Sequence, residues 1–116
     1  MRILAIRGEN LASLAEPFEI AFDAEPLSAA GLFAITGETG AGKSTILDAL
    51  CLALYDEFPR VKAEGANEAI PDGDNAPLSA TDPRTILRRG AGRGIARVDY
   101  AARVGAGYRE RCELVR

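Results

Sequence analysis

A nine-residue stretch rich in glycine sets the strongest limit on what this chain can be. Residues 37–45 are Gly-Glu-Thr-Gly-Ala-Gly-Lys-Ser-Thr, so a glycine, four further residues and Gly-Lys-Ser follow one another. Glycine has no Cβ, and the backbone N–H groups of such a loop can therefore approach a phosphate closely. The pattern is typical of a phosphate-binding loop. We assign this binding to nine residues: Gly37, Glu38, Thr39, Gly40, Ala41, Gly42, Lys43, Ser44 and Thr45.

Two side chains of this stretch have distinct expected roles. Lys43 would supply a full positive charge to the β- and γ-phosphates of a nucleotide. Ser44 would offer its hydroxyl to Mg²⁺, which takes its other ligands from water, the nucleotide and one or two protein oxygens. A helix that follows the loop would direct its N-terminal dipole and unpaired N–H groups at the same phosphates.

The flanking residues supply the context that such a loop needs, a strand before it and a helix after it. Residues 31–36 are a short apolar run bounded by glycines, and we predict a strand there. Residues 46–55 are apolar except for Asp48 and rich in Leu and Ala, so we predict a helix that is buried on most sides. The alternative is a chance glycine loop before an ordinary helix, and both neighbours favour phosphate binding.

Composition and cysteine usage indicate one small domain. With 116 residues, 47% of them apolar, the chain can bury only a modest core. Two cysteines, Cys51 and Cys112, form no disulfide framework and suit a reducing cytosol. Arg2 and Arg7 interrupt the first apolar stretch, and no apolar run approaches the roughly 20 residues of a membrane helix. We expect a soluble, cytoplasmic protein without a membrane partner.

Two strands precede the glycine-rich stretch, and a loop follows the helix. Residues 2–7 are apolar between two arginines, and residues 18–22 alternate apolar and other side chains. The short connection between these runs predicts an antiparallel pair. Residues 57–83 contain four prolines and several acidic residues without periodicity, so we predict a long mobile surface loop rather than a binding site.

The last third of the chain predicts a β-hairpin. Residues 85–90 indicate a short strand or turn, and two alternating runs then flank the Gly-Ala-Gly sequence at 105–107. A three-residue loop there would place apolar residues opposite one another, whereas a two-residue loop would set them against arginines. The predicted pairs are Val104 with Tyr108, Tyr100 with Cys112, and Val98 with Leu114.

Residues around the glycine-rich stretch resemble the N-terminal segment of the SbcC family, the SMC-like ATPase subunits of the bacterial SbcCD nuclease. The resemblance rests on Asn-Leu-Ala-Ser-Leu at 10–14, on residues 31–37 and on residues 43–55, and it continues more weakly to the final hairpin. It implies an α/β P-loop NTPase, the N-terminal lobe of an ABC/SMC-type head over residues 1–116. We expect a mixed or antiparallel sheet, one phosphate-loop helix and a terminal β-hairpin.

The same resemblance implies the ligands and the partners. ATP and Mg²⁺ would bind at the glycine-rich stretch, with Asn10 and Ser13 near the nucleotide. The implied partners are a second ATPase head, an SbcD-like nuclease subunit and double-stranded DNA. The C-terminal half of the head and a coiled coil would lie outside this chain. The implied function is ATP binding that controls DNA end processing in double-strand-break repair.

Hydrolysis in this family uses a Q-loop glutamine, an Asp-Glu pair, a switch histidine and a signature motif from a second subunit. This chain contains no Gln and no His. Asp56 and Glu57 follow an apolar run and imitate the Asp-Glu pair, but Asp56 would lie about 20 Å along the helix from Lys43. We therefore expect an N-terminal fragment that does not hydrolyse ATP by itself.

Positive charge is concentrated at the end of the chain. Residues 83–116 contain nine arginines and three acidic residues, a net charge of +6, while the first 82 residues carry −9. Clustered arginines can contact DNA phosphates, and the alternative is a solvated sheet face whose acidic partners lie outside the chain. The candidate DNA contacts are Arg84, Arg88, Arg89, Arg93 and Arg97, with Arg109 and Arg111 as an extension.

Two other functions remain open on the sequence alone. One is an ordinary P-loop transport ATPase or small kinase, although antiparallel strands before the loop disfavour the parallel core of a kinase. The other is a non-hydrolysing DNA-binding or interaction module that keeps a nucleotide as a structural ligand. DNA binding that ignored nucleotide and survived Lys43→Ala would support this module.

Overall fold

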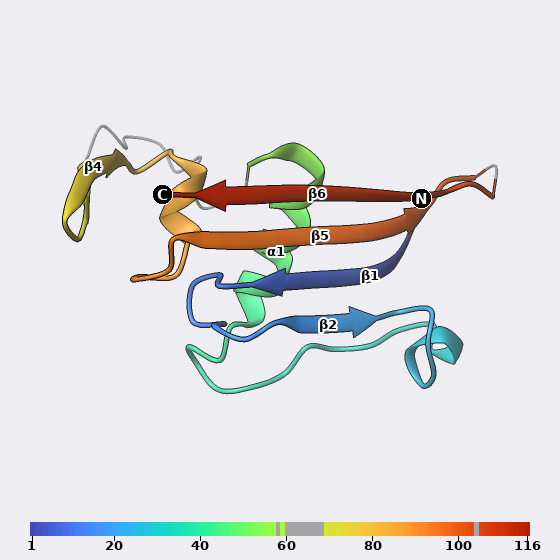
Figure 1. The fold of residues 1–116 in the computed structure, drawn as a ribbon. Helices are drawn as coiled ribbons and strands as arrows, with labels where there is room; N and C mark the ends of the chain where they lie inside the picture. The colour runs from blue at the N-terminus through green and yellow to red at the C-terminus, as the bar shows by residue number, and fades with distance from the viewer. Residues whose placement is uncertain (58, 60–68, 104) are drawn as a thin grey trace.

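The computed structural model describes residues 1–57, 59, 69–103 and 105–116. Its strands are β1 (Arg2–Glu9), β2 (Phe18–Ala21), β3 (Ala69–Asp72), β4 (Asn75–Ser79), β5 (Arg93–Ala101) and β6 (Gly107–Val115). The α-helix α1 is Lys43–Tyr55, and 3-10 turns lie at Leu27–Ala29 and Pro83–Ile86. A four-stranded antiparallel sheet in the order β2-β1-β5-β6 forms one layer, and α1 lies against one of its faces (Figure 1).

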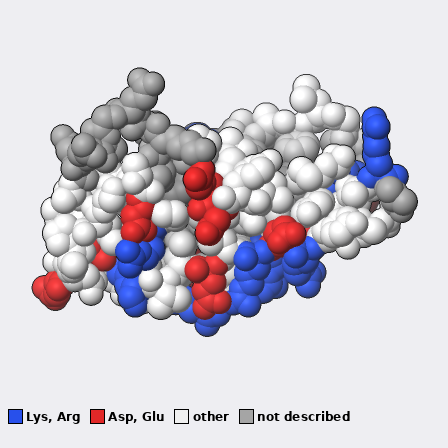
Figure 2. All heavy atoms as spheres, turned by 90° about the horizontal axis from the view of Figure 1, so that it is seen from above, with Lys and Arg blue, Asp and Glu red and all other residues white. Residues whose placement is uncertain are grey.

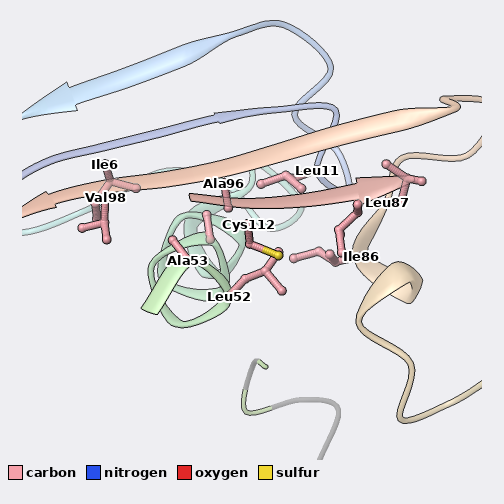
Figure 3. Packing of buried hydrophobic residues seen from close by; sticks show 11 residues of the cluster. Ile6, Leu11, Leu52, Ala53, Ile86, Leu87, Ala96, Val98 and Cys112 are labelled. Carbon is pink, nitrogen blue, oxygen red and sulfur yellow. The ribbon is translucent and has the colours of Figure 1, made fainter. Parts of the chain in front are cut away.

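Alternation of side chains along the strands gives the sheet one apolar face. In β5, Ala96 and Val98 have no exposed surface, while Arg97 and Asp99 belong to the opposite face. The small side chains of Ala49 and Ala96 let α1 lie close to the sheet. The resulting core between α1 and the sheet (Figure 3) contains Ile6, Leu11, Ala49, Leu52, Ala53, Ile86, Leu87, Ala96, Val98, Cys112 and Leu114.

The two N-terminal strands and the helix are confirmed. Residues 2–7 lie within β1, which pairs antiparallel with β2 so that Ile6 faces Ile20. Residues 46–55 lie within α1. Burial of this helix on most sides is wrong, because Leu47 is 55% exposed and Tyr55 is 70% exposed. The sheet covers only one side of α1.

The strand predicted at residues 31–36 is absent from the structure. The segment runs beside β2 (Figure 1) without forming a strand, although Phe33 stacks on Phe22 with ring centroids 5.0 Å apart. Leu32 is 91% exposed and Ile35 is 39% exposed. A strand requires a hydrogen-bonded neighbour, and among the described residues no strand pairs with this segment. The segment therefore has apolar contacts but no strand partner within the described part of the chain.

The predicted loop at residues 57–83 is wrong for residues 69–79. Strands β3 and β4 form a two-stranded antiparallel sheet, with Gly73 at a φ of 62° in the turn. Asp72 of this small sheet forms an ion pair with Arg116, which is 44 positions later, and Leu78 is buried. Contacts from distant sequence thus order a segment whose composition indicated a loop. Residues 58 and 60–68 of the predicted loop lie outside the described residues.

Residues 85–90 form the turn that the sequence allowed. The 3-10 turn Pro83–Ile86 begins after Asp82, whose side chain accepts a hydrogen bond from the Arg84 N–H, 2.8 Å away. Leu87 then forms an isolated bridge with Leu11. This bridge joins the segment to the connection between β1 and β2.

The terminal β-hairpin is confirmed, but its predicted register is wrong. Ala101 pairs with Gly107, so the loop spans residues 102–106 and is longer than predicted. Cys112 faces Ala96 rather than Tyr100, and Leu114 faces Gly94 rather than Val98. Val104, the remaining member of the predicted pairs, lies outside the described residues.

Side-chain pairing accounts for the observed register. It stacks Tyr100 on Tyr108, with centroids 5.4 Å apart, and sets Arg109 opposite Asp99. The predicted register would have placed Asp99 opposite Glu113, and two like charges directly opposite each other destabilise a sheet. The observed register also sets Arg97 opposite Arg111, so its favourable pairs, Asp99 with Arg109 and Tyr100 with Tyr108, are accompanied by one pair of like charges.

Candidate nucleotide-binding site

The glycine-rich loop, residues 37–42, leads directly into α1. Gly40 has a φ of 83°, and Gly42, the N-cap of α1, has a φ of 95°. Side chains rarely adopt such left-handed angles, so the loop requires glycine at both positions. The Ala41 N–H donates to the Glu38 carbonyl oxygen at 3.2 Å and closes a turn within the loop. The first N–H groups of α1 lack intrahelical acceptors and suit an anion.

Lys43 places its charge over this loop. Its Nζ donates to the carbonyl oxygens of Gly37 and Glu38, both at 2.6 Å. An ammonium has three donors, and two are therefore engaged by the loop. The side chain lies where it would meet a phosphate held by the loop and the helix N-terminus.

Ser44 and Thr45 differ in exposure. Ser44 is partly exposed in the first turn of α1, so its hydroxyl is accessible to a cation. Thr45 is only 4% exposed, and its side chain lies among protein atoms. The contribution of Thr45 to a bound nucleotide would thus come from its backbone N–H.

A tight turn at residues 10–14 forms the second part of the site. The N–H and carbonyl groups of Leu11 and Leu14 bond one another at 3.0 and 2.8 Å, and Asn10 and Ala12 have positive φ angles of 55° and 46°. The turn touches the glycine-rich loop, because a Cβ at Gly42 would lie 2.7 Å from Cδ2 of Leu14. The structure therefore brings the segment of Asn10 and Ser13 to the glycine-rich loop.

Within this turn the two predicted nucleotide contacts are not equivalent. The Asn10 side chain is already engaged, since its Nδ2 donates to the Arg93 carbonyl oxygen at 3.0 Å. Ser13 is exposed, and its carbonyl oxygen accepts a hydrogen bond from Arg88. Ser13 thus presents an accessible side-chain surface, while Asn10 acts within the scaffold.

Metal ligands other than Ser44 are few in this region. Among the described residues, no group of three or more His, Cys, Asp or Glu side chains could hold a metal ion. Asp56 lies at the C-cap of α1, at the opposite end from Lys43, and its Oδ1 accepts a hydrogen bond from the Cys112 thiol at 2.9 Å. The interpretation of Asp56 as the end of the helix is confirmed. The site fits a phosphate, and it offers Mg²⁺ one hydroxyl.

Three of the candidate DNA contacts already have partners in the chain. Arg84 binds the Asp82 carboxylate, with Nη2 2.7 Å from Oδ2, and this hydrogen bonding lowers the pKa of Asp82. Arg93 forms an ion pair with Glu113. Arg88 donates to backbone carbonyls of the 10–14 turn. These side chains therefore stabilise the fold locally.

The outer face of the sheet carries alternating charges. Figure 2 shows blue and red side chains interleaved along this side of the molecule. Asp99 binds both Arg109 and Arg7, and chiefly the Arg109 hydrogen bond holds the pKa of Asp99 well below its usual range. Arg89 is exposed and forms no hydrogen bond or ion pair with a described residue, and Arg97 Nε is buried with no described hydrogen-bond partner.

An apolar hollow lies on the other side of the sheet, beside α1. It has a volume of about 350 Å³. Its walls come from β1, from α1 and from residues 22–35, and its apolar lining includes Ile3, Ile6, Phe22, Phe33, Ile35 and Leu47. The glycine-rich loop contributes none of the lining, so the hollow is separate from the candidate nucleotide site.

Comparisons with known proteins agree with this geometry. A family model described as an AAA domain matches residues 5–106. A Rhodobacter capsulatus protein, named as the SbcC component of the nuclease SbcCD, is 58% identical over 108 residues, which is 93% of this chain and 9% of that protein. The Pseudomonas aeruginosa protein of the same name is 58% identical over all 116 residues, which is 10% of its length.

A more distant relative matches about half of the chain. The Bacillus subtilis protein of that name is 48% identical over 60 residues, or 52% of this chain and 5% of that protein. The chain thus spans about a tenth or less of the length of these relatives, and the resemblance stated from the sequence is confirmed. In the described part of the chain, no helix has the length and apolar character needed to cross a membrane.

Proposed function

The chain belongs to the AAA domain family, and from that membership we propose that it is the ATP-binding N-terminal segment of an SbcC-type ATPase subunit. One observation carries the proposal. The glycine-rich loop enters α1 through Gly42, and Lys43 directs its ammonium back over the loop. This arrangement gathers a helix N-terminus, backbone N–H groups and a full positive charge at one place.

Different groups of the loop would bind different parts of Mg²⁺-ATP. Backbone N–H groups of residues 37–45 bind phosphate oxygens, and the Lys43 ammonium neutralises the β- and γ-phosphates. The accessible Ser44 hydroxyl binds Mg²⁺, which supplies positive charge between the phosphates. Ser13 reaches the nucleotide from the adjacent turn, while Asn10 supports that turn through its bond to the Arg93 carbonyl.

Hydrolysis would be completed by residues outside this chain. The sequence offers neither glutamine nor histidine to orient or deprotonate a water molecule. Phosphate transfer depends mainly on positioning and charge stabilisation, and a second ATPase head with the C-terminal half of the same head would supply the missing groups. The chain alone would bind ATP without turnover.

The apolar hollow supports the proposal that this chain is part of a longer protein. Phe33 and Leu47, on neighbouring segments that line the hollow, are 47% and 55% exposed, and residues 31–36 pair with none of the described strands. Surfaces of this kind are normally covered in a folded protein. We propose that the C-terminal half of the head covers the hollow and supplies a strand to residues 31–36.

The name of the relatives supports the remaining partners. They are components of a nuclease, so we propose an SbcD-like nuclease subunit, a second ATPase head and double-stranded DNA as partners, in the cytoplasm. ATP-dependent engagement of two heads would control the access of the nuclease to DNA ends. Arg89, exposed and without a described partner, is the best placed of the candidate contacts with DNA phosphates.

Calorimetry with Mg²⁺-ATP tests the proposal, with Lys43→Ala measured beside the wild type and hydrolysis assayed on the same samples. Residues 1–116 should bind ATP weakly, lose this binding in Lys43→Ala, and show no turnover. Binding that survives Lys43→Ala would refute nucleotide binding at the loop. Robust turnover by residues 1–116 would refute the need for a C-terminal half.

A further inference from the structure

Arg88 joins two segments that are far apart in sequence. Its Nη1 donates to the carbonyl oxygens of Ala12 at 3.2 Å and of Ser13 at 3.1 Å. Both carbonyls belong to the 10–14 turn, in which Ala12 has a positive φ. Positive φ is unfavourable for alanine, and a charged donor that binds two carbonyls of the turn stabilises it.

The backbone of Arg88 is anchored on both sides. Its N–H donates to the Asn10 carbonyl oxygen at 2.9 Å, and its own carbonyl oxygen accepts from Arg116 Nη1 at 3.1 Å. Arg116 is in turn paired with Asp72, and these side chains are only 13% and 7% exposed. The guanidinium of Arg88 therefore extends from a fixed base.

The turn held by Arg88 supports the glycine-rich loop through one side chain. Leu14 packs against Gly42 so closely that a Cβ on Gly42 would lie 2.7 Å from Cδ2 and 2.9 Å from Cγ of Leu14. Gly42 is the N-cap of α1 and directly precedes Lys43. A displaced turn would move the surface on which this end of the loop rests.

We propose that Arg88 is a positioning residue of the nucleotide site rather than a contact with DNA. Its guanidinium holds the 10–14 turn, Leu14 of that turn supports Gly42, and Gly42 orients the start of α1 toward the phosphates. This inference rests on the proposed function, because it assigns Arg88 to the same ATP site. It also explains why the guanidinium of Arg88 donates to backbone carbonyls, although the surrounding segment is basic.

The test compares Arg88→Met with Arg89→Met in the intact protein bound to its partner subunit. Arg89 is the matched control, because it is exposed and has no hydrogen bond or ion pair with a described residue. A fluorescent ATP analogue reports nucleotide affinity, and DNA affinity is measured without nucleotide at two salt concentrations. Arg88→Met should weaken ATP binding about tenfold and leave DNA binding unchanged. Arg89→Met removes the proposed DNA contact, so it should leave ATP binding unchanged and weaken DNA binding.

The results that would contradict the positioning role of Arg88 differ from the result that would contradict the proposed function. Wild-type ATP affinity in folded Arg88→Met would overturn the inference, as would a loss of DNA affinity with a smaller salt dependence and no change in ATP binding. Lys43→Ala in the same titration separates the two proposals. If Lys43→Ala binds ATP normally, the proposed function fails; if it does not and Arg88→Met does, only the positioning role fails.

A second variant covers the case in which Arg88→Met fails to fold. Leu14→Ala removes the contact with Gly42 and leaves the hydrogen bonds of Arg88 in place. It should weaken ATP binding, and unchanged affinity would overturn the inference. Where all variants fold, Arg88→Met and Leu14→Ala combined should cost no more affinity than the weaker-binding single variant, because both act through one contact. Fully additive losses would contradict this coupling.

Discussion

The two sides of α1 differ in how completely the described residues cover them. Toward the sheet, Ala49 and Leu52 have no exposed surface and lie in a continuous core. Away from it, Leu47 is 55% exposed at the rim of a hollow of about 350 Å³. We call the side of α1 toward the sheet its finished side and the opposite side its unfinished side. Both sides are apolar in sequence.

This contrast shows which contacts the chain supplies for itself. The finished side is packed by β1, β5 and β6, whose strands pair with one another. On the unfinished side, residues 31–36 have an apolar sequence but no pairing partner among the described strands. The candidate nucleotide site lies at the start of this same helix, beside the 10–14 turn, whose Leu11 belongs to the core on the finished side.

The largest expected effect comes from truncating a side chain on each side of α1. Leu52→Ala should destabilise residues 1–116 by about 3 kcal/mol, because it opens a cavity in the core. Leu47→Ala should change stability by less than about 0.5 kcal/mol, as exposed positions usually do. Urea denaturation of both variants measures the difference. Equal losses would show that the two sides are packed alike.

Alanine substitutions at two glycines of the loop have smaller expected effects. They distinguish backbone strain at a positive φ from steric overlap with Leu14. Gly42→Ala should cost about 2 kcal/mol and weaken ATP binding, because it combines a positive φ with a Cβ that meets Leu14. Gly40→Ala also has a positive φ, but no atom lies within 4 Å of its Cβ position, so it should cost about 1 kcal/mol. Thermal denaturation compares them. Identical losses would remove the role of Leu14 as a support.

The protonation of the Cys112 thiol makes stability depend on pH and so provides a test of packing on the finished side of α1. Burial, with the Asp56 carboxylate beside it, raises the pKa of this thiol to about 12. The unfolded chain releases the proton near its ordinary pKa of about 8.5, so stability is complete below that pH and falls as pH rises toward 12. At pH 9 the loss should be about 0.8 kcal/mol. Cys112→Ser should flatten this alkaline dependence; an unchanged profile would assign it to another group.

The smallest expected effect lies on the charged outer face. The pKa of Asp99 is held below its usual range chiefly by Arg109, so this pair stabilises the fold above about pH 4 and ceases to do so as pH falls through the depressed pKa. Asp99→Asn should cost about 0.5 kcal/mol at neutral pH, because its main partner, Arg109, has a side chain that is 61% exposed. Denaturation at neutral and acidic pH should show the cost disappearing in acid. A cost that persisted in acid would indicate packing instead.

Local sequence was sufficient for the elements that depend on neighbouring residues. The strands β1 and β2, the helix α1 and the glycine-rich loop each follow from a pattern within about ten residues. Alternation also identified the buried faces of β5 and β6, because the face of a strand depends only on parity.

Features fixed by distant residues escaped prediction. In the hairpin Asp99 meets Arg109, and Asp72 of the β3-β4 sheet meets Arg116. The hydrogen bonds of Arg88 reach carbonyls 75 and 76 positions away, and its basic neighbours gave no indication of them. The sequence did contain a signal for the register, because the opposite charges of Asp99 and Arg109 could meet across the hairpin.

The uncovered hollow has a consequence for synthesis. Ribosomes add about 5–20 residues each second, and the Pseudomonas aeruginosa relative is ten times longer than the part matched by this chain. In a protein of that length, the hollow would stay open for about one to three minutes after residues 1–116 emerge. During that delay the alternating charges of the outer face would keep the nascent segment in solution, and a chaperone that binds apolar clefts would find its target beside α1.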